Sequence, residues 1–421
     1  MLALDAPPES RESLFQSPAF MEELGVQESL VLDLFVKHAF RAGNCTLSSL
    51  AETLKLPIEL VEQIFRNLKS QQLIEVKGMR GDDFAFVLSP AGKNLAAERM
   101  QISRYCGPVP VSLSHYQAVV KKQAVRVKVN RERLAYAYSD LIVPPDLIER
   151  LGPALVLQSS MFLYGPSGTG KSSLAERLLR IFNDAVAVPY AIEVDGAIIS
   201  MFDPAVHRPA DAPLGHCDPR WAWCARPCIV VGGELVASML ELQRDAETGA
   251  YVAPLHVKAN NGIFVIDDFG RQLLAPRDLL NRWIVPLDRR VDFLAMSSGS
   301  KFAVPFEVFV VFSTNLNPTE LADEAFLRRI PNKILVDAVS PGVFDQIVQR
   351  TISSRGWQSD AGAAQYLREV CQKRGGDLRP CYPRDFFRII ESISAFNEKE
   401  PRLTVEDVDR AAELYFGKLT V

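Results

Sequence analysis

The sequence has no long hydrophobic run. None of its uninterrupted apolar stretches approaches the roughly 20 residues that a helix needs to cross a bilayer. Residues 1–8 contain no basic group and no apolar core of the length that signal peptides have. We therefore expect a cytoplasmic protein that does not insert into membranes.

Cysteine is scarce, and neither sign of charge dominates. The seven cysteines are an odd number in a chain of 421 residues, which favours reduced thiols over a framework of disulfides. The formal net charge of −4 argues against a surface that generally coats nucleic acid, but it leaves a local basic patch open. A hydrophobic share of 48% suits a soluble globular protein, and this length predicts two or three domains.

The most informative stretch is rich in glycine and lies between an apolar run, residues 161–164, and leucines at helical spacing. A strand, a glycine-rich loop and a helix in this order cradle nucleotide phosphates, because the loop aims backbone N–H groups at phosphate oxygens. Lys171 is expected to reach the β- and γ-phosphates, and the Ser172 hydroxyl to bind Mg²⁺. The residues expected to contact the nucleotide are Gly165, Pro166, Ser167, Gly168, Thr169, Gly170, Lys171, Ser172 and Ser173.

Two further apolar stretches end in polar side chains. Residues 263–266 predict a buried strand that ends at Asp267 and Asp268, and residues 309–312 predict another that is followed by Asn315. Beside a phosphate loop, Asp267 is placed to hold the Mg²⁺ shell, and Asp268 to orient or deprotonate the attacking water. Between these two strands the residues on either side of a serine-rich turn predict an inserted hairpin.

Residues 28–100 predict three helices, a β-hairpin and a closing helix. This order resembles a winged-helix domain, whose functional interpretation is DNA binding through the third helix. The basic and acidic residues of this segment are equal in number, and Glu59 and Glu62 oppose Arg66 and Lys69 on the third helix. Phosphate contact needs a surplus of positive charge. We therefore favour docking to a protein, with binding to nucleic acid as the alternative.

The remaining segments are less specific. Residues 1–27 are expected to be a flexible leader, and residues 101–140 a connector whose basic residues favour a solvated helix face or a subunit contact. Residues 338–421 predict four helices, with Arg384 at the start of the third.

One loop-rich stretch gathers histidine and cysteine. Its soft ligands would suit Zn²⁺, but its spacing lacks the paired Cys-x-x-Cys pattern of common structural sites. We favour free thiols over a zinc site there. The residues concerned are His207, His216, Cys217, Cys224 and Cys228.

Taken in order, these motifs resemble those of AAA+ ATPases over roughly residues 141–418. The ordered set comprises GPSGTGKS, IFVIDD, VFSTN, DEAFLRRI and YPRDFFRII. The resemblance implies an α/β fold with a P-loop parallel sheet, helices on both of its faces and a C-terminal helical lid. The expected domains are a winged-helix-like α+β domain at 28–100, a nucleotide-binding domain at 141–337 and the lid at 338–421.

The resemblance also implies roles for single residues, with Walker A in the glycine-rich loop. An arginine finger acts across a subunit interface on the charge that spreads during phosphoryl transfer. The alternative for such an arginine is an ion pair within its own subunit, to Asp323 or Glu324. The implied assignments are Walker B at Asp267 and Asp268, sensor 1 at Asn315, the arginine finger at Arg329 or Arg328, and sensor 2 at Arg384.

The order of the elements around the acids is similar to that of the MoxR and magnesium chelatase branch of AAA+ proteins. A strand that ends in acids is followed by a helix, a hairpin and a further strand. One residue departs from the family pattern, because Asp268 stands where most members have glutamate. An aspartate is one methylene shorter, so the water must come closer or turnover is slow.

The sequence thus predicts an ATPase that uses ATP and Mg²⁺. The resemblance implies a homo-oligomer, a hexamer, that remodels a protein client. ATP is favoured over GTP by the resemblance and by the absence of an Asn-Lys-x-Asp motif. Two alternatives stay open, namely an ATP-controlled DNA-binding regulator or loader, and a slow signalling switch.

Overall fold

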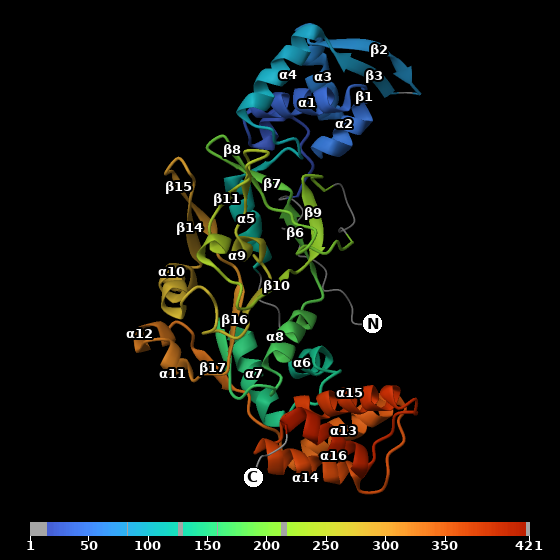
Figure 1. Ribbon diagram of the computed structural model, residues 1–421. Coiled ribbons are helices and arrows are strands. Elements are labelled where there is room, and N and C mark those ends of the chain that lie inside the picture. Colours follow the sequence, from blue (N-terminus) through green and yellow to red (C-terminus); the bar gives the residue numbers. More distant parts are fainter. Residues whose placement is uncertain (1–14, 82, 125–128, 158, 212–216, 418–421) are drawn as a thin grey trace.

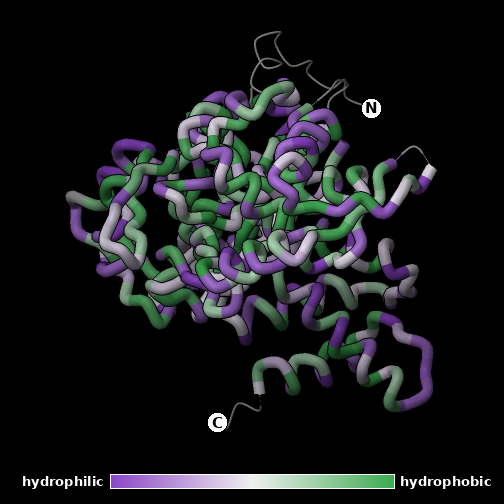
Figure 2. The backbone as a smooth tube through the Cα atoms, turned by 90° about the horizontal axis from the view of Figure 1, so that it is seen from above, coloured by the Kyte–Doolittle hydropathy of each residue, from purple (hydrophilic) through white to green (hydrophobic). Residues whose placement is uncertain are grey.

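The computed structural model describes residues 15–417, apart from residues 82, 125–128, 158 and 212–216. The helices and small sheet of residues 28–102 lie at one end of the molecule, and the helices of residues 341–416 lie at the other (Figure 1). Two larger sheets occupy the region between them. Hydrophobic stretches of backbone gather towards the centre, with many hydrophilic stretches around them (Figure 2).

A five-stranded sheet carries the candidate site, and all neighbouring strands in it are parallel. Its strands, in spatial order, are β10 (Cys228–Val231), β13 (Ile263–Ile266), β16 (Phe309–Thr314), β5 (Met161–Tyr164) and β17 (Asn332–Leu335). From β5 the chain crosses to β10 at one edge and returns through β13 and β16. In open α/β sheets, such a reversal leaves a crevice at the carboxyl ends of the strands, where ligands bind.

Alternating side chains give this sheet two buried faces. On β13, Ile263 contributes to one core and Phe264 to the other. The first core includes residues of α6 (Arg131–Ala137), α7 (Pro145–Leu157) and α8 (Lys171–Arg177), and the second includes residues of α10 (Pro276–Arg289). The predicted α/β class, with helices on both faces of a parallel sheet, is confirmed.

A second, mixed sheet lies between the parallel sheet and the N-terminal helices (Figure 1). The nucleotide-binding domain expected at 141–337 was predicted to be built on a parallel sheet, but the strands between residues 185 and 252, apart from β10, lie outside that sheet. One reason is the two-residue turn at Asp195 and Gly196, where φ is 49° and 79°. Such a turn closes an antiparallel hairpin rather than a parallel crossover. The sheet order is β11 (Gln243–Arg244), β12 (Tyr251–Val252), β8 (Ala197–Ser200), β7 (Ala191–Val194), β4 (Val111–Ser112).

Two antiparallel strand pairs share a core with the second sheet, and together with that sheet they form what is called here the middle region. One joins β6 (Ala185–Pro189) to β9 (Trp221–Ala225). The other joins β14 (Val291–Ala295) to β15 (Lys301–Pro305) and confirms the hairpin predicted between the acids and Asn315. The other short helices between residues 111 and 330 are α5 (Leu113–Gln123), η3 (Leu178–Ile181), η4 (Ala237–Leu240), α9 (Leu255–Lys258), α11 (Pro318–Leu321) and α12 (Glu324–Leu327).

Residues 28–102 contain the predicted helices and hairpin. Thr46 and Ser89 cap two of the helices through their side-chain oxygens. The three strands form an antiparallel sheet in the order β1, β3, β2. The elements are α1 (Glu28–Ala42), β1 (Cys45–Thr46), α2 (Leu47–Leu54), α3 (Ile58–Ser70), β2 (Ile74–Arg80), β3 (Asp83–Leu88) and α4 (Pro90–Ile102).

The segments expected to be a leader and a connector are partly folded. Residues 1–14 lie outside the described residues, but Phe15 is buried, and η2 (Met21–Leu24) follows it. Within 101–140, β4 and α5 belong to the middle region, whereas α6 packs on the parallel sheet. The connector's basic residues Arg126 and Lys128 lie outside the described residues.

The predicted C-terminal helical region is present and has a core of its own. Its four helices are α13 (Pro341–Arg355), α14 (Ala363–Gly375), α15 (Cys381–Phe396) and α16 (Val405–Phe416). Among the described residues, no helix combines the length and the apolar character needed to span a membrane.

Candidate phosphate-binding site

The glycine-rich loop connects the carboxyl end of β5 to α8, as predicted. Gly165, Gly168 and Gly170 have φ angles of 138°, 80° and 94°, a region that side chains with a Cβ rarely adopt. A Cβ on Gly165 would also overlap the Val336 carbonyl oxygen. The backbone conformation therefore favours glycine at all three positions, and at Gly165 there is also no room for a Cβ atom.

The side chain of Lys171 links the loop to the residue that follows β16 through hydrogen bonds. Its side chain is buried, and its Nζ donates to the carbonyl oxygens of Gly165 (2.9 Å) and Pro166 (2.8 Å) and to Asn315 Oδ1 (2.7 Å). Burial lowers the pKa of Lys171, while the negative charges of Asp267 and Asp268 act in the opposite direction. The lysine is thus a buried cation held at the carboxyl edge of the sheet.

The predicted acids lie at the end of β13, next to Asn315. The Asn315 Nδ2 donates to Asp268 Oδ1 at 3.2 Å, so a chain of hydrogen bonds runs from Lys171 through Asn315 to Asp268. Asp268 is exposed and has a φ of 49°, and its N–H donates to Asp267 Oδ1 at 3.1 Å. The structure therefore brings together the predicted lysine, asparagine and second acid.

The donors available for a metal ion suit Mg²⁺. This ion binds oxygen ligands and usually takes only one or two carboxylates besides phosphate oxygens and water. Asp267, half-buried at the end of β13, offers a carboxylate, and Ser172, half-buried in the first turn of α8, offers a hydroxyl. These two side chains are the ones that the sequence predicts as metal ligands, and their chemistry fits the ion.

The two arginines after α12 have different environments. The Arg329 Nε donates to Asp288 Oδ2 on α10 at 2.7 Å. Arg328 is exposed, and its guanidinium has no partner among the described residues. The ion pair considered from sequence was to Asp323 or Glu324, so the contact of Arg329 with Asp288 was not anticipated.

Two arginines lie near the start of α15. Arg384, the predicted sensor 2 residue, has a side chain 68% exposed and a long contact of 3.4 Å to Asp385. Arg379 was not predicted from sequence, yet its Cδ lies 3.6 Å from the position that a Cβ on Gly168 would take. The N–H of Cys381 donates to the Gly168 carbonyl oxygen at 3.2 Å. A signal that could have pointed to Arg379 is its place two residues before this helix begins.

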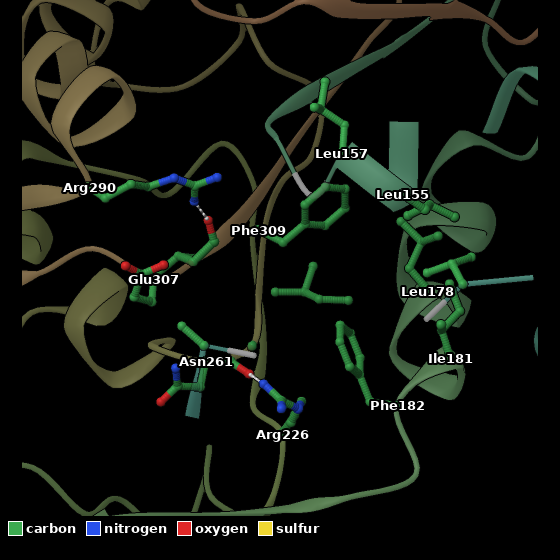
Figure 3. Close-up of a pocket in the computed structure, with 15 residues that line it drawn as sticks. Leu155, Leu157, Leu178, Ile181, Phe182, Arg226, Asn261, Arg290, Glu307 and Phe309 are labelled. Carbon is green, nitrogen blue, oxygen red and sulfur yellow. Dashed lines mark hydrogen bonds between the residues drawn. The ribbon is translucent and has the colours of Figure 1, made fainter. Parts of the chain in front are cut away.

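A separate cavity of about 290 Å³ lies away from this site (Figure 3). It is lined by Ile263 and Phe309, the first residues of β13 and β16, so it is at the amino edge of the sheet. Figure 3 shows Arg290 and Glu307 on one side of it and Phe182 on the other. The phosphate loop, by contrast, is at the carboxyl edge.

The histidine and cysteine stretch does not form a metal centre among the residues described. There, no group of three or more histidine, cysteine or acidic side chains is placed to hold a metal ion. Both His207 ring nitrogens are engaged: Nδ1 accepts from the Asp203 N–H at 2.9 Å, and Nε2 lies 2.9 Å from the Lys258 carbonyl oxygen. The cysteines Cys217, Cys224 and Cys228 are free thiols, and His216 lies outside the described residues.

Comparisons with known proteins give distant matches. A family model described as a domain of unknown function (DUF8689) matches residues 340–414. No curated protein gives a significant match. A mutant of RuvB from Thermotoga maritima is 13% identical with a TM-score of 0.40, over 66% of this chain and 71% of that one. NtrX from Brucella abortus is 12% identical with a TM-score of 0.37, over 75% and 60% of the two chains.

A third match is the RuvB Holliday junction branch migration motor of Thermotoga maritima. It is 14% identical with a TM-score of 0.35, over 72% of this chain and 71% of that one. At this level of similarity, these matches do not identify what the present chain binds or does.

Proposed function

We propose that this chain is an Mg-ATP hydrolase of the AAA+ type that works as a homo-oligomer, a hexamer, on a protein partner. The observation that carries the proposal is the hydrogen-bonded chain from Lys171 through Asn315 to Asp268. It links a phosphate-binding loop to a surface carboxylate across the carboxyl ends of neighbouring parallel strands.

In this proposal each side chain has one task. Lys171 exchanges its loop carbonyl and amide partners for β- and γ-phosphate oxygens. Ser172 and Asp267 hold Mg²⁺, which neutralises charge on those oxygens. Asp268 receives or orients the proton of the attacking water, and Asn315 fixes both the carboxylate and the water. Positioning and charge stabilisation of this kind supply most of the catalysis in phosphoryl transfer.

An exposed arginine supports hydrolysis at a subunit interface. Arg328 is exposed and has no partner among the described residues, whereas Arg329 is held by Asp288. A trans-acting arginine must reach beyond its own subunit, so we assign the arginine finger to Arg328 and a structural role to Arg329.

The N-terminal module is proposed to be a winged-helix-like adaptor for a protein. On α3, Arg66 pairs with Glu62 at 3.1 Å, so its charge is already partly neutralised. The hairpin instead exposes apolar side chains, with Met79 62% and Phe84 39% exposed. This combination favours a protein surface over DNA. The β14 and β15 hairpin, placed before the strand that Asn315 follows, supports an assignment to the MoxR and magnesium chelatase branch.

Nucleotide binding and phosphate release by the full chain test this proposal. We expect Lys171→Ala to weaken binding of a fluorescent ATP analogue at least tenfold, on the order of one charge-assisted hydrogen bond, and to stop phosphate release. Lys373→Ala, on α14, is the control and should behave as wild type. A wild-type chain that neither binds ATP nor releases phosphate would overturn the proposal.

A further inference from the structure

The segment that carries Arg328 is anchored on both sides of this arginine. Phe326 and Ile330, two residues before and two residues after it, are 5% and 0% exposed and belong to the core on one face of the parallel sheet. Arg329 is held by Asp288 of α10. Arg328 itself is exposed. The backbone around Arg328 is therefore fixed to the protein, while its side chain stays accessible to a neighbouring subunit.

Lys333 adds a polar anchor to the same segment. It lies on β17, and its Nζ donates to the carbonyl oxygens of Leu327 at 2.8 Å and Ile330 at 2.7 Å. Leu327 is the last residue of α12 and directly precedes Arg328. The last carbonyls of a helix have no partner within the helix, so a lysine can satisfy them. One ammonium group thus joins the two carbonyls that flank Arg328 and Arg329.

The anchor itself has a rigid base. β17 pairs with β5 along its length, with Lys333 opposite Phe162. Burial lowers the pKa of Lys333, and in the part of the chain that the structure describes its ammonium forms hydrogen bonds to backbone carbonyls rather than an ion pair. The lysine therefore connects the backbone around Arg328 to the central sheet of its own subunit.

We propose that Lys333 is a positioning residue for the proposed arginine finger, holding the backbone so that Arg328 is presented to the neighbouring subunit in one orientation. A guanidinium is planar and binds phosphate oxygens in a fixed geometry, and a displacement of about 1 Å can cost about 100-fold in rate. This inference rests on the proposed function, and Lys333 lies outside the five sequence motifs that resemble AAA+ proteins.

Phosphate release and binding of a fluorescent ATP analogue by the full chain, both with Mg²⁺, test the inference. Lys333→Met keeps the aliphatic stem and removes the ammonium. We expect it to lower the maximal rate of phosphate release about 10- to 100-fold and to change ATP binding less than about twofold. Arg328→Ala should lose more, because it lacks the arginine altogether. Lys333→Arg, which keeps donors for the two carbonyls, should retain most of the rate, and Lys373→Met on α14 is the control and should behave as wild type.

Mixtures of variants show in which subunit Lys333 acts. In our proposal, a Lys333→Met subunit has an intact nucleotide site and a displaced finger. Mixing it with Lys171→Ala, whose finger is intact, should therefore restore phosphate release, whereas mixing it with Arg328→Ala should not. The reverse pattern would mean that Lys333 acts on the nucleotide site of its own subunit, and the inference would be wrong.

The remaining outcomes also decide between a positioning role and a merely structural one. If Lys333→Met hydrolyses ATP at the wild-type rate, loses ATP binding together with hydrolysis, or regains activity with neither partner, Lys333 does not position the finger. If wild type itself does not hydrolyse ATP, or Arg328→Ala hydrolyses it as fast as wild type, the proposed function fails instead. Neither of these two results involves Lys333, so the two failures are distinguishable.

Discussion

At the residue scale, the side chains of the candidate site already form hydrogen bonds with one another. Lys171 has three oxygen partners, and one of them, Asn315, passes the connection to Asp268. A buried cation needs such partners, because an unpaired buried charge is costly. Phosphate oxygens would replace the loop carbonyls as partners of Lys171, and because they are charged they would form stronger hydrogen bonds with it. Ligand binding would therefore also stabilise the buried charge of the lysine.

Substitution of Asp268 separates binding from chemistry. We expect Asp268→Asn to bind ATP normally and to lose about 10²- to 10⁴-fold in hydrolysis, the usual contribution of a general base. Asp268→Glu, which introduces the residue most common in the AAA+ proteins that the sequence resembles, should keep hydrolysis. Single-turnover phosphate release measures both. Equal rates for wild type and Asp268→Asn would contradict the assigned role, and a slow wild type unaffected by either change would favour the switch alternative.

At the scale of elements, the β14 and β15 hairpin is fixed by a buried polar network. Asp292 on β14 accepts from Arg282 Nη1 of α10 at 2.6 Å and lies 2.7 Å from His256 Nε2 of α9. Asp292 and His256 are both 1% exposed. Since α9 lies shortly before β13, the network links the hairpin to the strand that ends at Asp267.

Asp292→Asn should destabilise this region. Burial raises the pKa of Asp292, but His256 and Arg282 together hold that pKa below its usual value. A carboxyl with a depressed folded pKa adds stability above its unfolded pKa, about 3.9, and loses it as the pH falls through the lower folded pKa. We expect a loss of roughly 3 kcal/mol at neutral pH, which shrinks below about pH 4.

Thermal unfolding of wild type and Asp292→Asn across this pH range measures the effect. The control is Asp146→Asn, which removes an exposed pair with Arg150 and should cost at most about 1 kcal/mol. A variant as stable as wild type at neutral pH would show that the network does not hold the hairpin.

Most of the candidate site could be predicted from local sequence patterns, namely the positions of polar residues after apolar strands. Asp268 and Asn315 come within two residues of the ends of apolar strands, and Lys171 follows the glycine-rich loop after another. Parallel strands bring their carboxyl ends to one edge of the sheet. The Asp195 and Gly196 turn was also visible in the sequence, but the apolar residues around it suited a parallel sheet equally well. The contacts of Arg329 with Asp288 and of Arg379 with Gly168 depend on how separate elements pack, so spacing alone could not reveal them.

At the scale of the whole molecule, the N-terminal module is built into the chain's middle region. Arg220 and Asp218 form an ion pair in which both side chains are 1% exposed. The same guanidinium donates through Nη1 to the carbonyl oxygens of Leu24 (2.9 Å) and Pro110 (3.2 Å), which flank the module in sequence. The core of the module also continues into the second sheet. We therefore expect the N-terminal module to move with the middle region rather than on a free linker.

Arg220→Ala should release the module. It leaves Asp218 buried without its partner, and breaking a buried pair in this way costs about 3–5 kcal/mol. Limited proteolysis should then cut near residues 102–110, and small-angle scattering should show a more extended molecule. Arg104→Ala, an exposed side chain at the same junction, is the control and should leave the digestion pattern unchanged. Resistance of Arg220→Ala to protease would show that this ion pair does not hold the N-terminal module in place.

The measurement that tests the central claim most directly is the mass in solution, with and without Mg-ATP, together with the rate of phosphate release. It compares wild type, Arg328→Ala, and an equal mixture of Arg328→Ala with Lys171→Ala. We predict that Mg-ATP drives assembly, that Arg328→Ala binds ATP without hydrolysing it, and that the mixture regains activity because Lys171→Ala subunits supply Arg328 to intact sites. A monomeric Arg328→Ala chain that hydrolyses ATP at the wild-type rate would contradict the account.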